Sequence, residues 1–424
     1  MSQGIERFFL LSYCLACCWP GLGAKTELRT VREWAELEFV FPTDEDRQSA
    51  VEKSYYVSGN SIPLDVEVHH RDGPGQSRIF VTIPRFDVGR PITFGTVDNQ
   101  GKINAYPDYS WHDHQGENCQ GLTSVFRVAL DECQRLWIMD TGKIGDTQHC
   151  PPQLLAFDLQ TDKLIYRHIV ANTSYTPASL FITPVVDVRP RAPGDCSDTF
   201  VYVADVSGFG ILVVDISRDK SWRETQRLMF PYPNRGIFNI DNERFELMDG
   251  IFGMSLSPYQ PDKERFLYFH ALASTTENKI STNVLRNASH ENNGQLGIND
   301  IYVFQGERTS QSAAEAMDRN GIMYFGYMDP PSVLCWNTAT EFSPRNIHTL
   351  AVDQKTLQFA SGVKIVTNAK NEQELWVLTC SFQRLMTGTL SSKELNFRIH
   401  AEKVDKLLKN SPCKIGYQKA HGYH

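Results

Sequence analysis

One stretch of this chain, residues 121–170, constrains the fold more than any other. It reads GLTSVFRVALDECQRLWIMDTGKIGDTQHCPPQLLAFDLQTDKLIYRHIV and contains four short apolar runs, at residues 122–130, 136–140, 154–159 and 164–170. Each run has the length and the β-branched, aromatic or leucine content of a strand, and polar turn residues separate the runs. Four such strands with short connections predict one antiparallel sheet. Because both faces of this sheet would be largely apolar, it needs neighbours on both sides.

The same pattern recurs along the rest of the chain. An apolar strand, a polar turn and a second strand around an aromatic residue recur in five further segments, at residues 62–85, 179–205, 250–274, 312–338 and 361–381. The second-strand aromatics are Phe80, Trp137, Tyr202, Tyr268, Tyr324 and Trp376, spaced by roughly 50 to 65 residues. Six similar units predict an all-β fold, a six-bladed β-propeller of four-stranded antiparallel blades. A pair of β-sandwiches is the alternative, but sandwiches do not require six similar units.

A propeller fixes the expected domain organisation. The 424 residues could form two or three domains, but a propeller is one closed unit, and we assign it residues 25–410. Residues 34–41 (WAELEFVF) read as a strand that adds to the last blade and joins the two ends of the ring. Residues 43–53 then cross to the first inner strand. Residues 411–424 are expected to form a flexible tail.

The N-terminus has the pattern of a secretory signal. In residues 1–24, Arg7 precedes an apolar run at residues 8–19, and small residues at 21, 23 and 24 offer a cleavage site. The run is too short to span a bilayer, although an uncleaved anchor is the alternative. No other stretch is long and apolar enough to cross a membrane, so a secreted, extracellular protein without membrane association is expected.

The cysteines fit an exported protein. Seven remain after the signal: Cys119, Cys133, Cys150, Cys196, Cys335, Cys380 and Cys413. They form no CxxC pair, so no metal site and no cofactor are predicted. In an oxidising compartment we expect two or three disulfides, with at least one thiol left over. Asn172 and Asn287 each begin a glycosylation sequon.

Charge and motifs exclude several classes of function. The formal net charge is −8, which argues against a nucleic-acid partner because such proteins need a basic face. The chain contains no GxSxG, HExxH or P-loop pattern. The hydrolase and nucleotide-binding chemistries that these motifs carry are therefore not indicated.

Several ordered motifs resemble the insect Yellow/major royal jelly protein family. They are NCQGLTSVFRVALDECQRLWIMDTG, CPPQLLAFDL, ELMDGIFGMSLSP, RFLYFHALAST, VLRN, LCWN and LQFASGVKI, and the similarity runs over residues 34–408. The resemblance implies a secreted six-bladed propeller with a role in insect pigmentation, cuticle or catecholamine chemistry. Some family members resemble dopachrome-converting enzymes, some bind biogenic amines, and some are nutritive or structural, so the resemblance specifies the fold better than the activity.

A propeller places its ligand site at one mouth of the central channel. We therefore take the residues next to the predicted inner strands as candidate ligand contacts: Asn60, Asn118, Gln120, Tyr175, Ser179, Asp249, Phe252, Thr309, Phe359 and Ser361. Aromatic faces can stack on a ring and attract a cation, and the Asp249 carboxylate could pair with an ammonium. Capping of strands and hydration of the channel is the alternative role for each of them. Asn60, Asn118 and Asp249 could also offer oxygen ligands to calcium, but no further acid is evident at an equivalent position.

The sequence Trp111-His112-Asp113-His114 is a second candidate site. Two histidines two residues apart could bind a metal or move a proton. Because the segment lies in a polar loop with no third ligand at a defined spacing, we expect a structural role. The same is expected of His69, His70, His149, His168 and His270.

Three functions remain open from the sequence. The first is a secreted, monomeric protein that binds a small aromatic amine, catechol or quinone in the channel and acts in melanin or cuticle physiology. The second is a dopachrome isomerase of melanin biosynthesis, whose catalytic residues the sequence does not identify. The third is a structural extracellular protein.

Overall fold

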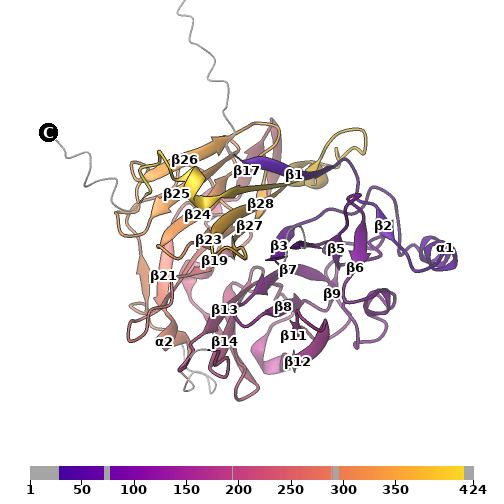
Figure 1. The fold of residues 1–424 in the computed structure, drawn as a ribbon, viewed down its shortest axis with the longest axis horizontal. Coiled ribbons are helices and arrows are strands. Elements are labelled where there is room, and N and C mark those ends of the chain that lie inside the picture. Colours follow the sequence, from indigo (N-terminus) through magenta and orange to yellow (C-terminus); the bar gives the residue numbers. More distant parts are fainter. Residues whose placement is uncertain (1–27, 71–76, 193, 288, 290–295, 415–424) are drawn as a thin grey trace, which may run out of the picture.

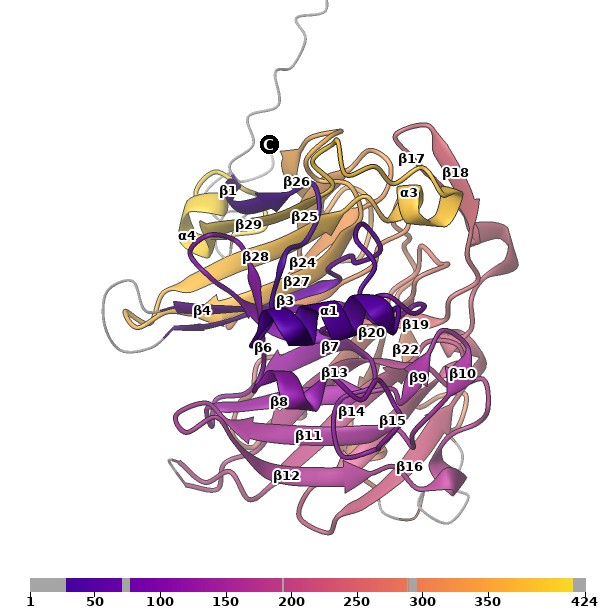
Figure 2. The same cartoon turned by 90° about the vertical axis from the view of Figure 1, so that its right-hand side faces the viewer.

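The computed structural model describes residues 28–70, 77–192, 194–287, 289 and 296–414. Six antiparallel sheets of four strands stand in a ring, as Figures 1 and 2 show from two directions. This is the six-bladed β-propeller that the repeat predicts. The predicted signal segment, residues 1–24, lies outside the described residues. No helix of the described part is long and apolar enough to cross a membrane.

Each blade is numbered by its order in the chain. Blades one to three contain β3 (Asp65–His70), β4 (Ser77–Thr82), β5 (Phe94–Val97) and β6 (Ile103–Ala105); β7 (Val125–Leu130), β8 (Arg135–Asp140), β11 (Gln153–Asp158) and β12 (Lys163–Ile169); and β13 (Phe181–Val188), β14 (Thr199–Asp205), β15 (Gly210–Asp215) and β16 (Lys220–Thr225). Blades four to six contain β19 (Ile251–Leu256), β20 (Phe266–Ala271), β21 (Asn278–Ser281) and β22 (Ile301–Val303); β23 (Glu315–Met317), β24 (Ile322–Tyr327), β25 (Ser332–Asn337) and β26 (Ile347–Val352); and β27 (Ala360–Thr367), β28 (Gln373–Cys380), β29 (Phe397–Lys403) and β1 (Arg29–Trp34).

The ring closes on both its inner and its outer side. The inner strands β3, β7, β13, β19, β23 and β27 each contact the inner strands of the two neighbouring blades, including β27 against β3. On the outside, the N-terminal strand β1 pairs antiparallel with β29 and so completes blade six. The first described strand and the last strand of the chain therefore belong to the same sheet.

The repeated aromatics lie where the sequence places them. Phe80, Trp137, Tyr202, Tyr268, Tyr324 and Trp376 occupy the second strand of blades one to six in turn, and all are buried. Large buried side chains at this position fill the space between neighbouring sheets, which explains why the pattern recurs once per blade. The four runs of residues 121–170 form β7, β8, β11 and β12, as predicted.

The predicted closing strand is placed a few residues too late. Of residues 34–41, only Trp34 belongs to β1, whereas β2 (Phe39–Val40) pairs parallel with β6 of blade one. The chain crosses from blade six to blade one between these strands. Helix α1 (Asp44–Glu52) follows, and the Thr43 side chain caps its N-terminus by accepting a hydrogen bond from the Asp46 amide.

The remaining elements lie in connections. Two hairpins, β9 (Lys143–Ile144) with β10 (Thr147–Gln148) and β17 (Ile237–Ile240) with β18 (Glu243–Glu246), accompany the helices α2 (Thr282–Leu285), α3 (Phe382–Thr387) and α4 (Val404–Leu407). Single 3-10 turns are η1 (Tyr109–Trp111), η2 (Asn172–Ser174), η3 (Arg227–Met229) and η4 (Pro233–Arg235). The β17–β18 hairpin and α3 lie together at one mouth of the ring (Figure 2).

Three disulfides cross-link the described residues. They join Cys119 to Cys150, Cys133 to Cys196 and Cys335 to Cys413, and the buried Cys380 is the thiol left over. The prediction of two or three disulfides is confirmed. The bond to Cys413 links the start of the predicted tail to β25 of blade five.

The Cys335–Cys413 disulfide is expected to stabilise the propeller by limiting the unfolded chain. It closes a loop with a sequence separation of 78 residues. The double variant Cys335→Ser/Cys413→Ser should therefore lose about 2–4 kcal/mol of unfolding free energy, measured by urea denaturation. The control is Cys380→Ala, which removes a buried thiol without breaking a disulfide and should cost about 1 kcal/mol. Equal losses in the two proteins would contradict the assigned role.

Candidate functional site

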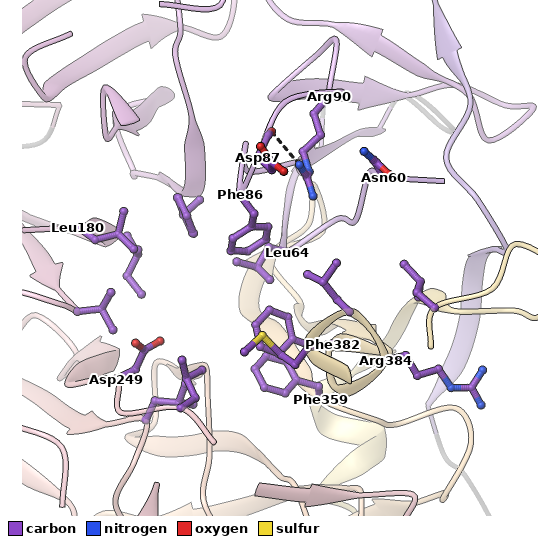
Figure 3. Close-up of a pocket in the computed structure, with 18 of the residues that line it drawn as sticks. Asn60, Leu64, Phe86, Asp87, Arg90, Leu180, Asp249, Phe359, Phe382 and Arg384 are labelled. Carbon is purple, nitrogen blue, oxygen red and sulfur yellow. Dashed lines mark hydrogen bonds between the residues drawn. The ribbon is translucent and has the colours of Figure 1, made fainter. Parts of the chain in front are cut away.

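A cavity of about 600 Å³ opens at one mouth of the central channel (Figure 3). Its wall is built by side chains on or next to the inner strands of five blades, together with α3. The apolar members are Leu64, Phe86, Phe126, Leu180, Ile182, Val206, Leu247, Phe252, Leu272, Phe359, Phe382, Leu385, Met386 and Leu390. A cavity of this size and character is typical of a small-molecule site.

Aromatic rings line one side of this cavity. Phe359 and Phe382 stack with their centroids 4.6 Å apart, and Phe86 meets Phe126 edge to face at 5.3 Å. Figure 3 shows Phe86, Phe359 and Phe382 together near the middle of the site. Such a wall offers ring faces to a flat aromatic ligand.

Phe359 adopts an unusual backbone conformation. Its φ angle is +40°, in the left-handed region that a bulky aromatic residue rarely occupies. The residue immediately precedes β27, and its ring lines the cavity. Backbone strain of this kind concentrates at functional sites, so the conformation singles out this wall of the cavity.

Asp249 is an isolated carboxylate in the apolar wall. It lies two residues before β19, and only its backbone carbonyl is bonded, accepting a hydrogen bond from the Ala273 amide at 3.1 Å. Among the described residues no side chain pairs with its carboxylate. Burial raises the pKa of Asp249 to about 7. A carboxyl group of this kind gains from a cationic ligand and can also exchange a proton near neutral pH.

A polar edge faces Asp249 across the cavity. Figure 3 shows Asn60, Asp87 and Arg90 on the side opposite Asp249. Arg90 is buried, and its Nη1 donates to the backbone carbonyl of Asp87 at 2.8 Å. Burial lowers the pKa of Arg90, and the nearby Asp87 opposes that effect. The cavity therefore has polar groups at two opposite ends and aromatic rings between them.

The outer rim is fixed by contacts between α3 and the β17–β18 hairpin. Arg384 of α3 forms ion pairs with Glu243 of β18, at 3.6 Å, and with Glu394. Thr389 Oγ1 also donates to Glu243 at 2.6 Å. Helix α3 ends at Gly388, whose φ of +72° is the left-handed conformation that glycine adopts most readily at a helix end.

Arg127 and Phe252 lie between this cavity and a second one. The guanidinium of the buried Arg127 lies 4.5 Å from the centroid of the Phe252 ring and donates to the Ser361 carbonyl. Beyond this pair, a second cavity of about 570 Å³ opens at the other mouth, with a polar wall that includes Glu67, Glu315 and Lys364. The two mouths of the propeller thus differ in chemical character.

Only part of the predicted contact set meets at the cavity. Asn60, Asp249, Phe252 and Phe359 line it, whereas Asn118, Gln120, Tyr175, Ser179, Thr309 and Ser361 do not. The proposed calcium set is therefore divided, because Asn118 is an exposed loop residue that accepts a hydrogen bond from the Gln120 amide.

The other predicted contacts have roles in the fold. Ser179 Oγ donates to Asp205 at 2.7 Å, and Ser361 binds Arg127 through its carbonyl. Tyr175 packs against the apolar core of blades two and three, and Thr309 is exposed.

The histidines of the Trp111–His114 segment do not share a site. His112 is buried, its Nε2 lies 3.0 Å from the Tyr106 carbonyl, and burial and Arg85 lower its pKa to about 3. His114 is exposed and pairs with Asp113. His112 is therefore a neutral structural residue, in line with the role expected for it.

Sequence reasoning missed the contribution of α3 and most aliphatic wall residues. Leu180 and Ile182 are two residues apart at the start of the inner strand β13, so their side chains lie on the same face. A search for every second residue on all six inner strands would have found them. Helix α3 lies between β28 and β29, and its six residues are too few for a recognisable helical period.

Comparison with known proteins places these features in a family. The family model described as "Major royal jelly protein" matches residues 123–413. Dopaminechrome tautomerase of Drosophila melanogaster is 31% identical over 407 residues, covering 92% of this chain and 85% of the relative. Major royal jelly protein 9 of Apis mellifera is 32% identical, covering 90% and 89%, and Protein yellow of Drosophila erecta is 31% identical, covering 97% and 75%. On this agreement, the chain belongs to the Yellow/major royal jelly protein family.

Proposed function

We propose that this protein binds a small aromatic amine, or a related catechol or quinone, in the apolar cavity. The observation that carries the proposal is the isolated Asp249 carboxylate in a wall otherwise made of aromatic and aliphatic side chains. An aromatic amine offers one flat apolar ring and one ammonium group. The ring would lie against Phe359 and Phe382, and the ammonium would pair with Asp249.

The low polarity of the site strengthens this pairing. Asp249 is half-buried and its carboxylate lacks a partner among the described residues, so the desolvation that raises its pKa is not compensated. A cation that enters the cavity offsets this cost, so the charged ligand gains more from Asp249 than it would from an exposed acid. Cations can also be attracted by the faces of the nearby rings.

The first prediction of the binding proposal concerns charge. Asp249→Asn keeps the shape of the side chain but removes the charge, so it should weaken dopamine and serotonin binding by about 2 kcal/mol, roughly 30-fold. Isothermal titration calorimetry measures this loss of affinity. The affinities for the uncharged ligands catechol and indole should change less than threefold. The matched control is Asp87→Asn, which alters an exposed acid of the same cavity. Equal losses for charged and uncharged ligands would refute the ion pair, and heat from no amine at all would leave a structural protein.

The second prediction concerns pH. Because the pKa of Asp249 in the empty cavity is about 7, most of the carboxyl groups are protonated at pH 6 and most are ionised at pH 8. An ammonium ligand requires the ionised form, so its affinity should fall about tenfold between pH 8 and pH 6. Titrations of dopamine at both values test this. Asp249→Asn should remove the pH dependence of the affinity. A wild-type affinity that does not change with pH would contradict the prediction.

A second candidate function is the tautomerisation of an aminochrome. It is favoured by the nearly neutral pKa of Asp249 and by the similarity to a dopaminechrome tautomerase. The reaction is redox-neutral: two protons leave the saturated carbons of the five-membered ring, their electron pairs make the ring system aromatic, and each of the two quinone oxygens gains a proton. Asp249 has the basicity that a general base needs at neutral pH.

The enzymatic candidate predicts a large kinetic effect. Wild-type protein should accelerate the loss of visible absorbance of dopachrome or dopaminechrome, and Asp249→Asn should lower kcat at least about 100-fold. Asp87→Asn should retain activity. No acceleration over buffer by the wild type would exclude this function while leaving the binding proposal intact.

The setting proposed for either function is extracellular, in pigmentation or cuticle physiology. Three disulfides support an oxidising compartment. The sequon residues Asn172 and Asn287 are both exposed, which supports their proposed glycosylation.

A further inference from the structure

A cluster of buried donor atoms lies between blades four and five, apart from the apolar cavity. His270 is the penultimate residue of β20, Glu277 immediately precedes β21, and Glu315 is the first residue of β23. One ligand atom from each, the histidine nitrogen and two carboxylate oxygens, lies within 4.8 Å of the others. All three residues are buried.

The hydrogen bonding of this cluster is incomplete. His270 Nδ1 lies 3.1 Å from Glu277 Oε2 and 3.0 Å from Glu315 Oε2. Within the described part of the chain, neither oxygen of Glu315 receives a hydrogen bond, and Glu277 Oε1 receives none either. A buried carboxylate without a donor is costly, so the Glu315 side chain indicates a positive partner at this point.

Neighbouring groups hold the donor atoms in place. His270 Nε2 lies 3.1 Å from the Ser312 carbonyl, which favours a proton on Nε2 and leaves Nδ1 directed at the carboxylates. Arg308 Nη1 donates to Glu277 Oε2 at 2.6 Å. Gly253 gives the imidazole its space, because a Cβ there would lie 2.4 Å from His270 Cε1. Such outer contacts are typical of ligands that are positioned for an ion.

The cluster borders the polar cavity of the channel. Glu315 lines the 570 Å³ cavity, while His270 and Glu277 lie behind it. The carboxylate oxygens of Glu315 are buried, so an ion enters from this cavity by displacing the Glu315 side chain.

We propose that His270, Glu277 and Glu315 bind one divalent transition-metal ion of the Zn²⁺ type, with an open coordination position toward the polar cavity. One imidazole nitrogen and two carboxylates form a donor set suited to Zn²⁺. Two carboxylates and Arg308 sum to one negative charge, so a dication gives one positive charge. A hydroxide or an anion from the polar cavity balances that charge at the open position.

The competing arrangement is a proton instead of an ion. Burial and Arg308 lower the pKa of His270, but Glu315 and Glu277 outweigh them and the pKa is raised. An imidazolium would neutralise the cluster without a metal. The two arrangements differ in whether a stoichiometric ion binds.

Metal titration of the full chain tests the proposal. EDTA-treated protein is titrated with ZnCl₂, MnCl₂ and CaCl₂ by calorimetry, and bound metal is measured by elemental analysis. We expect one Zn²⁺ per chain, weaker Mn²⁺ and no comparable Ca²⁺ binding. Glu315→Gln should weaken Zn²⁺ by at least about 100-fold, whereas Glu67→Gln, which changes another buried carboxylate of the same cavity, should leave it within about threefold.

Cobalt substitution keeps the test independent of folding losses. Co²⁺ bound by the wild type should give visible d–d absorption, and His270→Asn should abolish it while circular dichroism confirms a folded chain. The absence of a stoichiometric ion below 100 µM free Zn²⁺, or equal losses in Glu315→Gln and Glu67→Gln, would overturn the site and leave the imidazolium.

Discussion

The pairing of β1 with β29 is the interaction on which the rest of the structure depends. It completes blade six with a strand from the other end of the chain, and Trp34 Nε1 then donates to the Gly101 carbonyl of blade one at 2.7 Å. The seam therefore joins the last blade to the first by both a strand ladder and a side chain. Because five blades contribute walls to the apolar cavity, its shape requires a closed ring. A propeller with an open seam would keep its blades but lose the common mouth that holds Asp249 opposite Arg90 (Figure 3).

The fold could be predicted because the second strand of every blade is buried in the same way. A second strand buried on both faces needs a large apolar side chain, and the resulting aromatics, from Phe80 to Trp376, mark the blades in order. The closing strand does not share this environment. β1 is an edge strand with mostly exposed or half-buried residues, so its sequence RTVREW has little apolar character. Its place is decided by β29, which pairs Thr30 with His400 across 370 positions. The hydrophobic pattern of a short segment does not indicate a pairing over that distance in sequence. The prediction therefore chose residues 34–41, which are more apolar than β1.

The candidate site was only partly predictable for a related reason. Asp249, Phe252 and Phe359 were found because they lie next to inner strands whose positions the repeat supplied. Proximity to a strand end does not decide where a side chain points, however. The Ser179 hydroxyl donates a hydrogen bond to Asp205, and the Ser361 carbonyl accepts one from Arg127. These contacts join residues far apart in the sequence, so they can be seen only in the folded structure. Asn118 and Gln120 flank Cys119, whose disulfide to Cys150 anchors their loop away from the cavity.

The surroundings of Asp249 differ from those of the acids in the polar cavity. Arg127 faces the polar cavity, whereas the Phe252 ring on which it stacks lines the apolar one. Burial lowers the pKa of Arg127 to about 10, and Asp65 opposes the shift, so the guanidinium remains charged. Arg127 lines the polar cavity and not the apolar one. Phe252 thus separates a chamber rich in ion pairs from one that contains an isolated carboxylate. No cation of the described residues pairs with Asp249, so burial is the cause of its raised pKa, and a ligand that enters the apolar mouth is the partner that can restore its charge.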